Sequence, residues 1–313
     1  MNDGRVRRLG EELDELNRSI RAATGDSTGL VEELDYALRP QVHERRVPSF
    51  GAFVEPRTSL KEWTTGTGTE VSRRRVDDLQ DATVRRFADG IASWAVRRNG
   101  KVDDLVVFDR SVSSERDLTI LAAATGATIV QRHPNGTVRA VGEFGVLRHD
   151  GIDWQLIEPV DRWLDLGGCQ IGSLDREVFE RLLRFAVHDV AARRVGATFV
   201  VSPSGRLAPG SERPYGRPPE FRIDRPADLA PLYHVLGQLD GAAVFDERGA
   251  LRQLGIQLMP STVAETEVPA FRGARHTSAL RYSFDDPEAT VIVVSEDGPV
   301  SVLRAGMMLG QSG

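Results

Sequence analysis

The 313-residue sequence has little cysteine, no long apolar run and no excess of positive charge. Its one cysteine, Cys169, cannot form an intramolecular disulfide, which fits a reducing compartment. The formal net charge of −6 disfavours a broad nucleic-acid-binding face, so we do not expect nucleic acid as a partner. These absences exclude a disulfide-stabilised scaffold and argue against a nucleic-acid-binding protein.

Membrane and export signals are missing as well. The opening stretch MNDGRVRRLGEELDEL is charged throughout and lacks the apolar segment of a signal peptide. No apolar run approaches the roughly 20 residues that a helix needs to cross a bilayer. We therefore expect a cytoplasmic protein with no membrane partner.

What the sequence does contain is typical of a globular protein, since 40% of its residues are hydrophobic and 27% are charged. The length suggests two domains, each able to bury a core. Alternating helix and strand patterns predict an α/β (or α+β) domain over residues 1–160 and a second α/β domain over residues 161–313.

Periodicity and turn residues predict the elements of the first domain. We expect helices over 5–24, over 76–98 and in SERDLTILAAAT, and strands in VPSFGAFVEP, DLVVFD, ATIVQRH and, as one or two strands, TVRAVGEFGVLRH. The run TTGTGTE could cradle a phosphate, but it lacks the Lys and the following helix of a P-loop. We interpret it as a flexible turn.

The second domain follows the stretch PVDRWLDLGGCQIGSL, which we interpret as the junction. The expected order is a helix from Leu174-Asp175, a strand GATFVVSP, a Pro- and Gly-rich loop, a helix ADLAPLYHVLGQL, a hairpin over 242–258, an irregular stretch over 259–272, a helix RHTSALRYSF and a closing hairpin. On the first helix, His188 lies off the apolar stripe, and Arg193-Arg194 is a basic run. Both are interpreted as solvated.

Three short stretches in the second half carry residues that suit phosphate and metal chemistry. They are Asp240-Gly241-Ala242, Gly273-Ala274-Arg275-His276-Thr277-Ser278-Ala279 and Ser295-Glu296-Asp297-Gly298. The carboxylates of Asp240 and Glu296 can hold a divalent cation or accept a proton. A helix N-terminus with Arg275 suits phosphate oxygens, and His276 could bind metal or phosphate. Each stretch alone has an ordinary interpretation as a turn, a helix entrance or a strand end, but together they predict a nucleotide-phosphate site.

In the order LDGAAVF, GARHTSAL and VIVVSEDGPVSVL, these stretches resemble the diadenylate cyclase domain, the nucleotide-binding module also found in the DNA integrity scanning protein. That family carries Asp-Gly-Ala, then Arg-His-Arg within Gly-Thr-Arg-His-Arg, then a strand leading into Ser-Glu. The first and last motifs are intact here. In the middle motif Ala274 replaces the Thr and Thr277 replaces the last Arg. The resemblance covers residues 174–313.

The resemblance implies a central mixed β-sheet flanked by helices and an enzyme that condenses two ATP molecules into cyclic di-AMP and two pyrophosphates. Two domains would face each other, which implies at least a homodimer, with Mg²⁺ or Mn²⁺ as the cofactor. The catalytic residues would be Asp240, Arg275 and His276, and the metal ligands would be Asp240, His276 and Glu296. The further nucleotide-binding positions would be Gly241, Ala242, Gly273, Ala274, Thr277, Ser278 and Ser295.

The two replacements leave other functions open. Thr277 offers a hydroxyl where the family has a guanidinium, so one charge and a bidentate contact are lost. Arg272 and Arg281 are close enough in sequence to compensate. The alternatives to a working cyclase are a degenerate fold that binds ATP or a cyclic dinucleotide as a sensor, and an unrelated α/β protein. Residues 1–160 match no motif, and by analogy with the family we expect a sensor or regulatory domain there.

Overall fold

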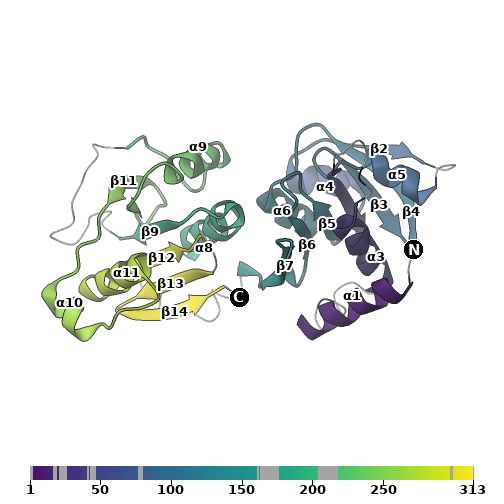
Figure 1. Cartoon of the computed structure of the whole chain (residues 1–313). Coiled ribbons are helices and arrows are strands. Elements are labelled where there is room, and N and C mark those ends of the chain that lie inside the picture. Colours follow the sequence, from purple (N-terminus) through teal and green to yellow (C-terminus); the bar gives the residue numbers. More distant parts are fainter. Residues whose placement is uncertain are drawn as a thin grey trace. The chain divides into compact units, whose positions relative to one another are not determined.

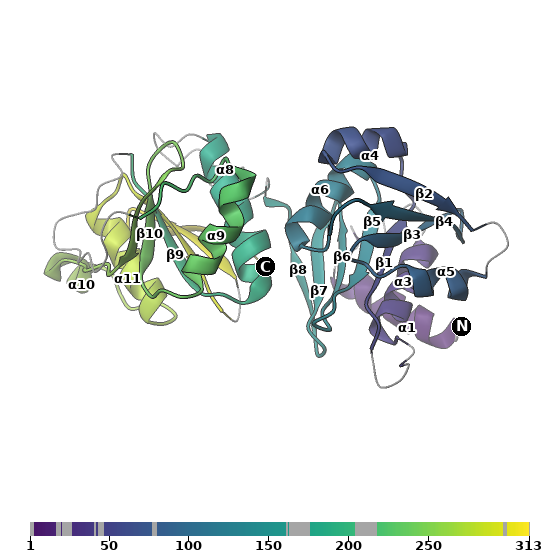
Figure 2. The ribbon, with the colours of Figure 1, turned by 90° about the horizontal axis from the view of Figure 1, so that it is seen from above.

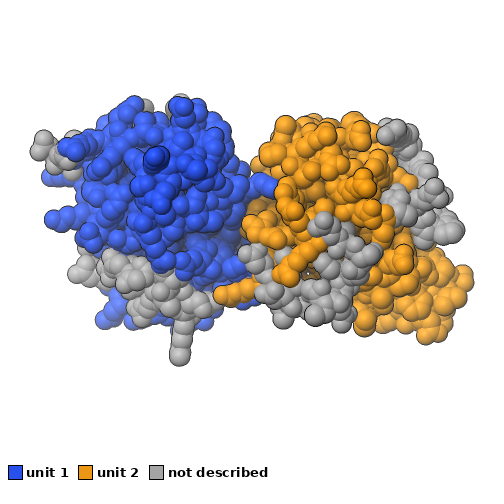
Figure 3. Space-filling model, turned by 180° about the vertical axis from the view of Figure 1, so that it is seen from behind, with its two compact units in different colours: residues 1–159 blue, residues 160–313 orange. Residues whose placement is uncertain are grey.

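The structure is a computed structural model, and it describes residues 3–16, 20, 27–40, 42, 47–76, 80–160, 162, 176–203, 218–296 and 299–312. The chain forms two compact units, Met1–Pro159 and Val160–Gly313, drawn in Figure 1 and coloured separately in Figure 3. Each has its own mixed sheet with helices, which confirms the predicted α/β class. Most of the expected junction, with Cys169, and the Pro-rich loop at 204–217 lie outside the described residues.

The described part of the first unit is built on an eight-stranded sheet in the order β2-β4-β3-β1-β5-β6-β7-β8. Its strands are β1 (Phe50–Val54), β2 (Val71–Arg75), β3 (Ser93–Arg98), β4 (Lys101–Phe108), β5 (Thr128–Arg132), β6 (Val138–Gly142), β7 (Gly145–His149) and β8 (Trp154–Ile157). β1 and β3 run parallel, and the other neighbours are antiparallel. Successive antiparallel strands from β5 to β8 therefore form a meander.

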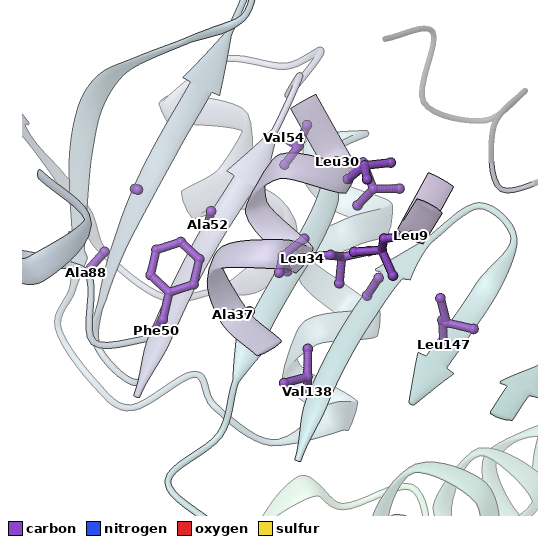
Figure 4. Packing of buried hydrophobic residues seen from close by; sticks show 14 of the residues in the cluster. Leu9, Leu30, Leu34, Ala37, Phe50, Ala52, Val54, Ala88, Val138 and Leu147 are labelled. Atoms are coloured by element: carbon purple, nitrogen blue, oxygen red, sulfur yellow. The ribbon is translucent and has the colours of Figure 1, made fainter. Parts of the chain in front are cut away.

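Helices cover both faces of this sheet (Figure 2). One face carries α1 (Asp3–Leu16), α3 (Ser27–Leu38) and α5 (Asp81–Phe87), and the other carries α4 (Leu60–Thr67) and α6 (Glu115–Thr125). Because side chains alternate along a strand, Ala52 and Val54 of β1 face α3, where Figure 4 shows them in one cluster with Leu34. Phe53 points to the other face and packs on Trp63 of α4, with ring centroids 4.7 Å apart.

A buried charge cluster fixes α3 and α5 to the sheet. The carboxylate of Glu33 on α3 has no exposed surface. It accepts hydrogen bonds from Arg85 Nε and Nη2 on α5, at 3.0 and 2.6 Å, and from Arg97 Nη1 on β3, at 2.8 Å. A buried carboxylate is tolerated only when such partners compensate for its lost hydration, so this cluster is part of the core.

The described part of the second unit has a six-stranded sheet in the order β11-β10-β9-β12-β13-β14. Its strands are β9 (Ala197–Val201), β10 (Ala242–Phe245), β11 (Leu251–Ile256), β12 (Thr290–Val294), β13 (Val300–Arg304) and β14 (Met307–Gln311). β9 and β10 are parallel, and the other neighbours are antiparallel. The sheet is therefore mixed, as the resemblance implies.

Helices lie on both sides of the second sheet (Figure 2). One side carries α8 (Arg176–Phe185), continued by the π-helix η1 (Ala186–Val190) and the 3-10 turn η2 (Ala191–Arg193), together with α9 (Pro226–Leu236); the other carries α10 (Thr262–Glu267) and α11 (Ala274–Asp285). Val200 and Val244 share a core cluster with Ala279 of α11. Phe199 points the other way, and its ring centroid lies 5.9 Å from that of Phe185 on α8.

The helix predicted over 76–98 is wrong in its second half. α5 ends at Phe87, and residues 93–98 form β3. Asp89 explains the change, because its Oδ1 accepts the backbone N–H groups of residues 91–93 at 2.7–2.9 Å. An aspartate that bonds the backbone ahead of it offers these groups an alternative to the helix.

Three other local expectations are also wrong. TTGTGTE is not simply a turn, since its first residues end α4, which starts at a capping box between Ser59 and Glu62. The stretch 259–272 contains α10, capped by the Ser261 hydroxyl, which accepts from the backbone of Ala264. His188 is 7% exposed rather than solvated. It lies in η1, where the extra residue per turn changes which side chains face the core.

Candidate nucleotide site

Three strand ends and one helix start meet at one end of the second sheet. Ala242 of β10 is paired with Thr198 of β9, and Val294 of β12 is paired with Ala197. β10 runs parallel to β9, whereas β12 runs antiparallel to it. The first residues of β9 and β10 therefore lie at the same end of the sheet as the last residue of β12. This topology brings together segments that lie about 100 residues apart in the sequence.

A pocket of about 280 Å³ lies at this end of the sheet. Its lining residues are Arg194, Val195, Gly196, Leu236, Gly237, Gln238, Leu239, Asp240, Arg275 and Glu296. The pocket therefore contains one charged residue from each of the three predicted stretches: Asp240, Arg275 and Glu296. It also contains a second guanidinium, that of Arg194.

Asp240 and Gly241 have separate roles at the pocket. Gly241 has φ of 100°, and a Cβ there would lie 2.6 Å from the backbone carbon of Gly255 and 2.8 Å from the nitrogen of Ile256. The glycine is thus required for the close approach of β11. Asp240 is exposed and makes no hydrogen bond or ion pair with another described residue. The turn interpretation explains Gly241, but it leaves the carboxylate of Asp240 available to a ligand.

Arg275 lies in the first turn of α11 and packs on bare backbone. A Cβ at position 196 would lie 2.2 Å from Nη1 and 2.8 Å from Cζ of Arg275, so only glycine leaves room for this position of the guanidinium. Nη2 of Arg275 is 3.8 Å from Oε1 of Glu296, with side chains 39% and 65% exposed. An ion pair this long and this exposed is weak, so both groups can turn to a ligand.

His276 is buried and does not line the pocket. Its Nε2 lies 3.4 Å from the Ser301 hydroxyl of β13, and its ring packs edge-on against Phe271 at 6.1 Å. Burial lowers the pKa of His276, and the charges of Arg272 and Arg275 lower it further. The neutral imidazole is therefore favoured. The predicted roles of His276 as catalytic residue and metal ligand stay predictions.

The hydroxyls of Thr277 and Ser278 bond to nearby backbone. Thr277 Oγ1 accepts from the N–H of Phe271 at 3.0 Å and donates to its carbonyl at 2.9 Å, which holds the loop before α11. Ser278 donates to the carbonyl of Arg275 at 3.1 Å. Neither residue lines the pocket. Their predicted nucleotide contacts would need these bonds to open.

The other predicted nucleotide-binding positions surround the pocket without lining it. Ala242 is buried at the start of β10, and Ser295 is half-buried just after β12. Gly273 precedes α11 with φ of 138° and ψ of 170°, a conformation that only glycine adopts readily. Ala274 is exposed at the first position of α11. These residues shape the loops that present Asp240 and Arg275.

The two arginines expected to compensate for Thr277 are engaged elsewhere. Arg281 donates to the carbonyls of Val268 and Glu265 and so joins α10 to α11. Arg272 donates to Gln311 of β14 at 2.5 Å. Arg194, which was interpreted as solvated, is exposed and also lines the pocket. It lies at the C-cap of η2 with φ of 56°, where the left-handed turn directs the chain into β9.

The predicted divalent cation stays a prediction, and the pocket supplies part of a donor set for it. Within the described ranges, no three His, Cys, Asp or Glu side chains converge as a metal-binding group, so the predicted set of Asp240, His276 and Glu296 is not assembled by the chain alone. Asp240 and Glu296 do line the same pocket. Mg²⁺ is commonly held by one or two carboxylates together with substrate phosphates and water, and this donor set meets that requirement.

The chain thus consists of two α/β domains, and the later of the two carries the pocket suited to a nucleotide. Residues 184–308 match the family model described as "DisA bacterial checkpoint controller nucleotide-binding", and residues 7–156 match "Probable sensor domain DACNK". The second unit thus matches the DisA-like nucleotide-binding family and the first unit matches a probable sensor domain, which confirms the resemblance.

Comparisons with whole proteins add little to this assignment. No match was found among curated proteins. A solved structure titled "The crystal structure of the hypothetical membrane spanning protein from Bacillus cereus" is 20% identical, with a TM-score of 0.32, over 44% of this chain and 71% of that chain. Among the helices described here, none combines the length and apolar character that crossing a membrane requires.

Proposed function

We propose that the second unit condenses two ATP molecules into cyclic di-AMP. In each half-reaction the 3′-oxygen of one ATP forms a bond to the α-phosphorus of the other. The bond from that phosphorus to the β-phosphate oxygen breaks, pyrophosphate leaves, and the hydroxyl proton passes to a base. The observation that carries the proposal is the convergence of Asp240, Arg275 and Glu296 in one pocket, each from a motif of the matched family.

The pocket residues divide this chemistry between them. Asp240 accepts the proton of the attacking hydroxyl or holds the cation, because its carboxylate is not committed to another described residue. Arg275 and the N–H groups at the start of α11 hold the phosphates, and Arg194 supplies a second guanidinium. Mg²⁺ or Mn²⁺, held by Asp240 and Glu296, would polarise the phosphate and lower the pKa of the hydroxyl.

The reaction needs two nucleotides, whereas one pocket suits one. Its volume of about 280 Å³ lies just below the range of small-molecule sites, which span roughly 300–1,000 Å³. We therefore propose that two copies of the unit pair face to face, each with one ATP. A two-fold contact presents the same residues twice, so each 3′-hydroxyl can reach the opposite α-phosphorus.

The test is incubation of the full chain with ATP and Mg²⁺ or Mn²⁺, with the product identified by mass spectrometry. We expect cyclic di-AMP and two equivalents of pyrophosphate. Mixing wild type with the Asp240→Asn variant should reduce activity by more than the variant's share, since each mixed pair lacks one required site. A strictly proportional loss, with a species that stays monomeric in ATP, would refute the paired mechanism.

A second function has one observation in its favour. The Thr277 hydroxyl is bonded to the backbone of Phe271, so nothing at this position replaces the family's guanidinium. A domain with this loss could bind ATP or a cyclic dinucleotide as a sensor without turnover. Saturable nucleotide binding by calorimetry, together with no product under either metal, would establish this alternative.

A further inference from the structure

A second cavity lies within the first unit, outside every motif discussed above. Its volume is about 360 Å³, which lies within the range for small-molecule sites. It is formed by α1, the end of α3 and the cross-strand pair His149 and Trp154 on β7 and β8. Leu9 of α1, which also lines it, belongs to the core cluster in Figure 4. The cavity is thus anchored on the core of the unit.

Its charged lining is mainly positive. Arg5, Arg8 and Arg39 line it, with Glu12 as the acidic residue among the described lining. Arg39 is bonded to the buried carboxylate of Asp35 at 2.6 Å, and Arg5 is 3.9 Å from it. Arg8 makes no ion pair with a described residue. The chain as a whole is acidic, so this local excess of guanidinium groups is not a general property of its surface.

Two aromatic rings also line the cavity. The rings of His149 and Trp154 pack edge to face with centroids 4.7 Å apart, and Leu38 lines the cavity as well. Nδ1 of His149 accepts the N–H of Gly151 at 3.2 Å. In the neutral ring the proton is then on Nε2, which is left as a hydrogen-bond donor. These two rings offer aromatic surface and one hydrogen-bond donor, but no further hydrogen-bond acceptor.

We propose that this cavity is a ligand site for a small organic anion with a flat ring, such as an aromatic carboxylate, sulfonate or phosphate. The acidic group pairs with Arg8 and the neighbouring guanidiniums, and the ring lies against Trp154 above Leu9. The size admits one such molecule. The proposal concerns the first unit alone and does not depend on the reaction proposed for the second.

The experiment uses the full chain and the fluorescent probe 8-anilino-1-naphthalenesulfonate. We expect one saturable site, and Arg8→Gln should weaken binding about tenfold, because a charge-assisted contact is lost. The matched control is Arg7→Gln on the same helix. Arg7 pairs with Glu11 and does not line the cavity, so its loss should leave affinity unchanged.

A measurement on the wild type alone avoids any folding defect in the variants. Benzenesulfonate should displace the probe, whereas benzyl alcohol and inorganic phosphate should compete at least tenfold less well, because each lacks one half of the recognised chemistry. Equal competition by benzyl alcohol would refute the anion site, and equal competition by phosphate would refute the ring site. Equal probe affinity for wild type and Arg8→Gln would place the probe elsewhere and overturn the proposal.

Discussion

One charged cluster in the first unit and the pocket charges of the second are arranged in opposite ways. In the first, Glu33 is fully buried and held by Arg85 and Arg97 through hydrogen bonds of 2.6–3.0 Å. In the second, Arg275 and Glu296 are 3.8 Å apart and substantially exposed. Buried charges must satisfy one another, so the first cluster holds helices to a sheet. Exposed charges that converge without satisfying one another, as in the second unit, are available to a ligand.

The cavity in the first unit combines both arrangements. Arg39 is ion-paired with the buried Asp35, whereas Arg8, which lines the same cavity, has no ion pair with a described residue. By the same reasoning Arg39 is partly structural and Arg8 is the residue that a ligand would recruit. The presence or absence of a carboxylate partner thus separates structural from ligand-binding guanidiniums within one cavity as well as between the two units.

The largest effect is expected from Asp240→Asn. The amide keeps the size of the side chain but loses the charge that accepts a proton or holds the cation. We expect turnover of ATP to fall by a factor of about 100 to 10,000, with an unchanged melting temperature. Glu247→Gln, an exposed carboxylate in the β10–β11 turn, is the control and should keep full activity. Wild-type rates in the Asp240 variant would exclude its proposed role.

Next in size is the effect of Glu33→Gln on stability. The substitution removes the hydrogen-bonded carboxylate partner of the buried Arg85 and one of the two carboxylate partners of the buried Arg97, whose other partner is Glu32. This should lower the free energy of unfolding of the first unit by about 3–5 kcal/mol. Tryptophan fluorescence in urea can follow this unit, because three of the four tryptophans lie within residues 1–159. Glu11→Gln, from an exposed pair on α1, should change stability by less than about 0.5 kcal/mol. Similar losses in both variants would contradict the comparison.

A smaller effect is expected when Gly196 is changed to Ala. The added Cβ would occupy the position of the Arg275 guanidinium, so we expect ATP binding to weaken about tenfold as that group moves. In the Arg275→Ala variant, the added Gly196→Ala substitution should weaken ATP binding little further, because both substitutions act on the same guanidinium. Gly237→Ala is the control, since this glycine lines the same pocket but a Cβ there would meet only ordinary contacts at 3.6 Å. Calorimetric titration of wild type, the two single variants Gly196→Ala and Arg275→Ala and the double variant measures the coupling, with Gly237→Ala titrated beside them.

Local patterns in the sequence predicted much of the second unit. Apolar runs bounded by Gly and Pro predicted β9, β10, β12 and β13, and the helix pattern predicted α11. The three motifs, known through the resemblance, predicted the pocket residues Asp240, Arg275 and Glu296. Strand β14 was missed because its exposed Met307 and Met308 show no alternation of apolar and polar residues.

The residues that were missed depend on tertiary contacts. Gly196 at the start of a strand gives no local sign that a guanidinium will pack on it. Arg194 belongs to a basic run, which is usually solvated. Glu33 on α3 looks like an ordinary surface glutamate until its two arginines, 52 and 64 residues away in the sequence, are brought to it. A sequence pattern shows the periodicity of a helix or strand, but it does not show which distant side chains will contact that element.

The smallest effect is a pH dependence that comes from His276. Its pKa is lowered in the folded protein by burial and by the charges of Arg272 and Arg275. Below the unfolded pKa of about 6.5 the unfolded chain therefore binds more protons than the folded one. Stability from this group is complete above pH 6.5 and declines as the pH falls toward the folded pKa. His276→Asn should flatten this decline, whereas His234→Asn, at an exposed position on α9, should not.

Nucleotide binding should weaken that pH dependence if Arg275 holds a phosphate. The added negative charge offsets one of the causes that lower the pKa of His276, so its folded pKa should move back toward 6.5 on addition of ATP. Proton NMR can resolve this shift, since the chain has six histidines and His276→Asn assigns the signal. Because Arg8 lies in the first unit, a ligand in its cavity should leave the His276 titration unchanged. A titration of His276 that ATP does not move would instead place the phosphates away from Arg275.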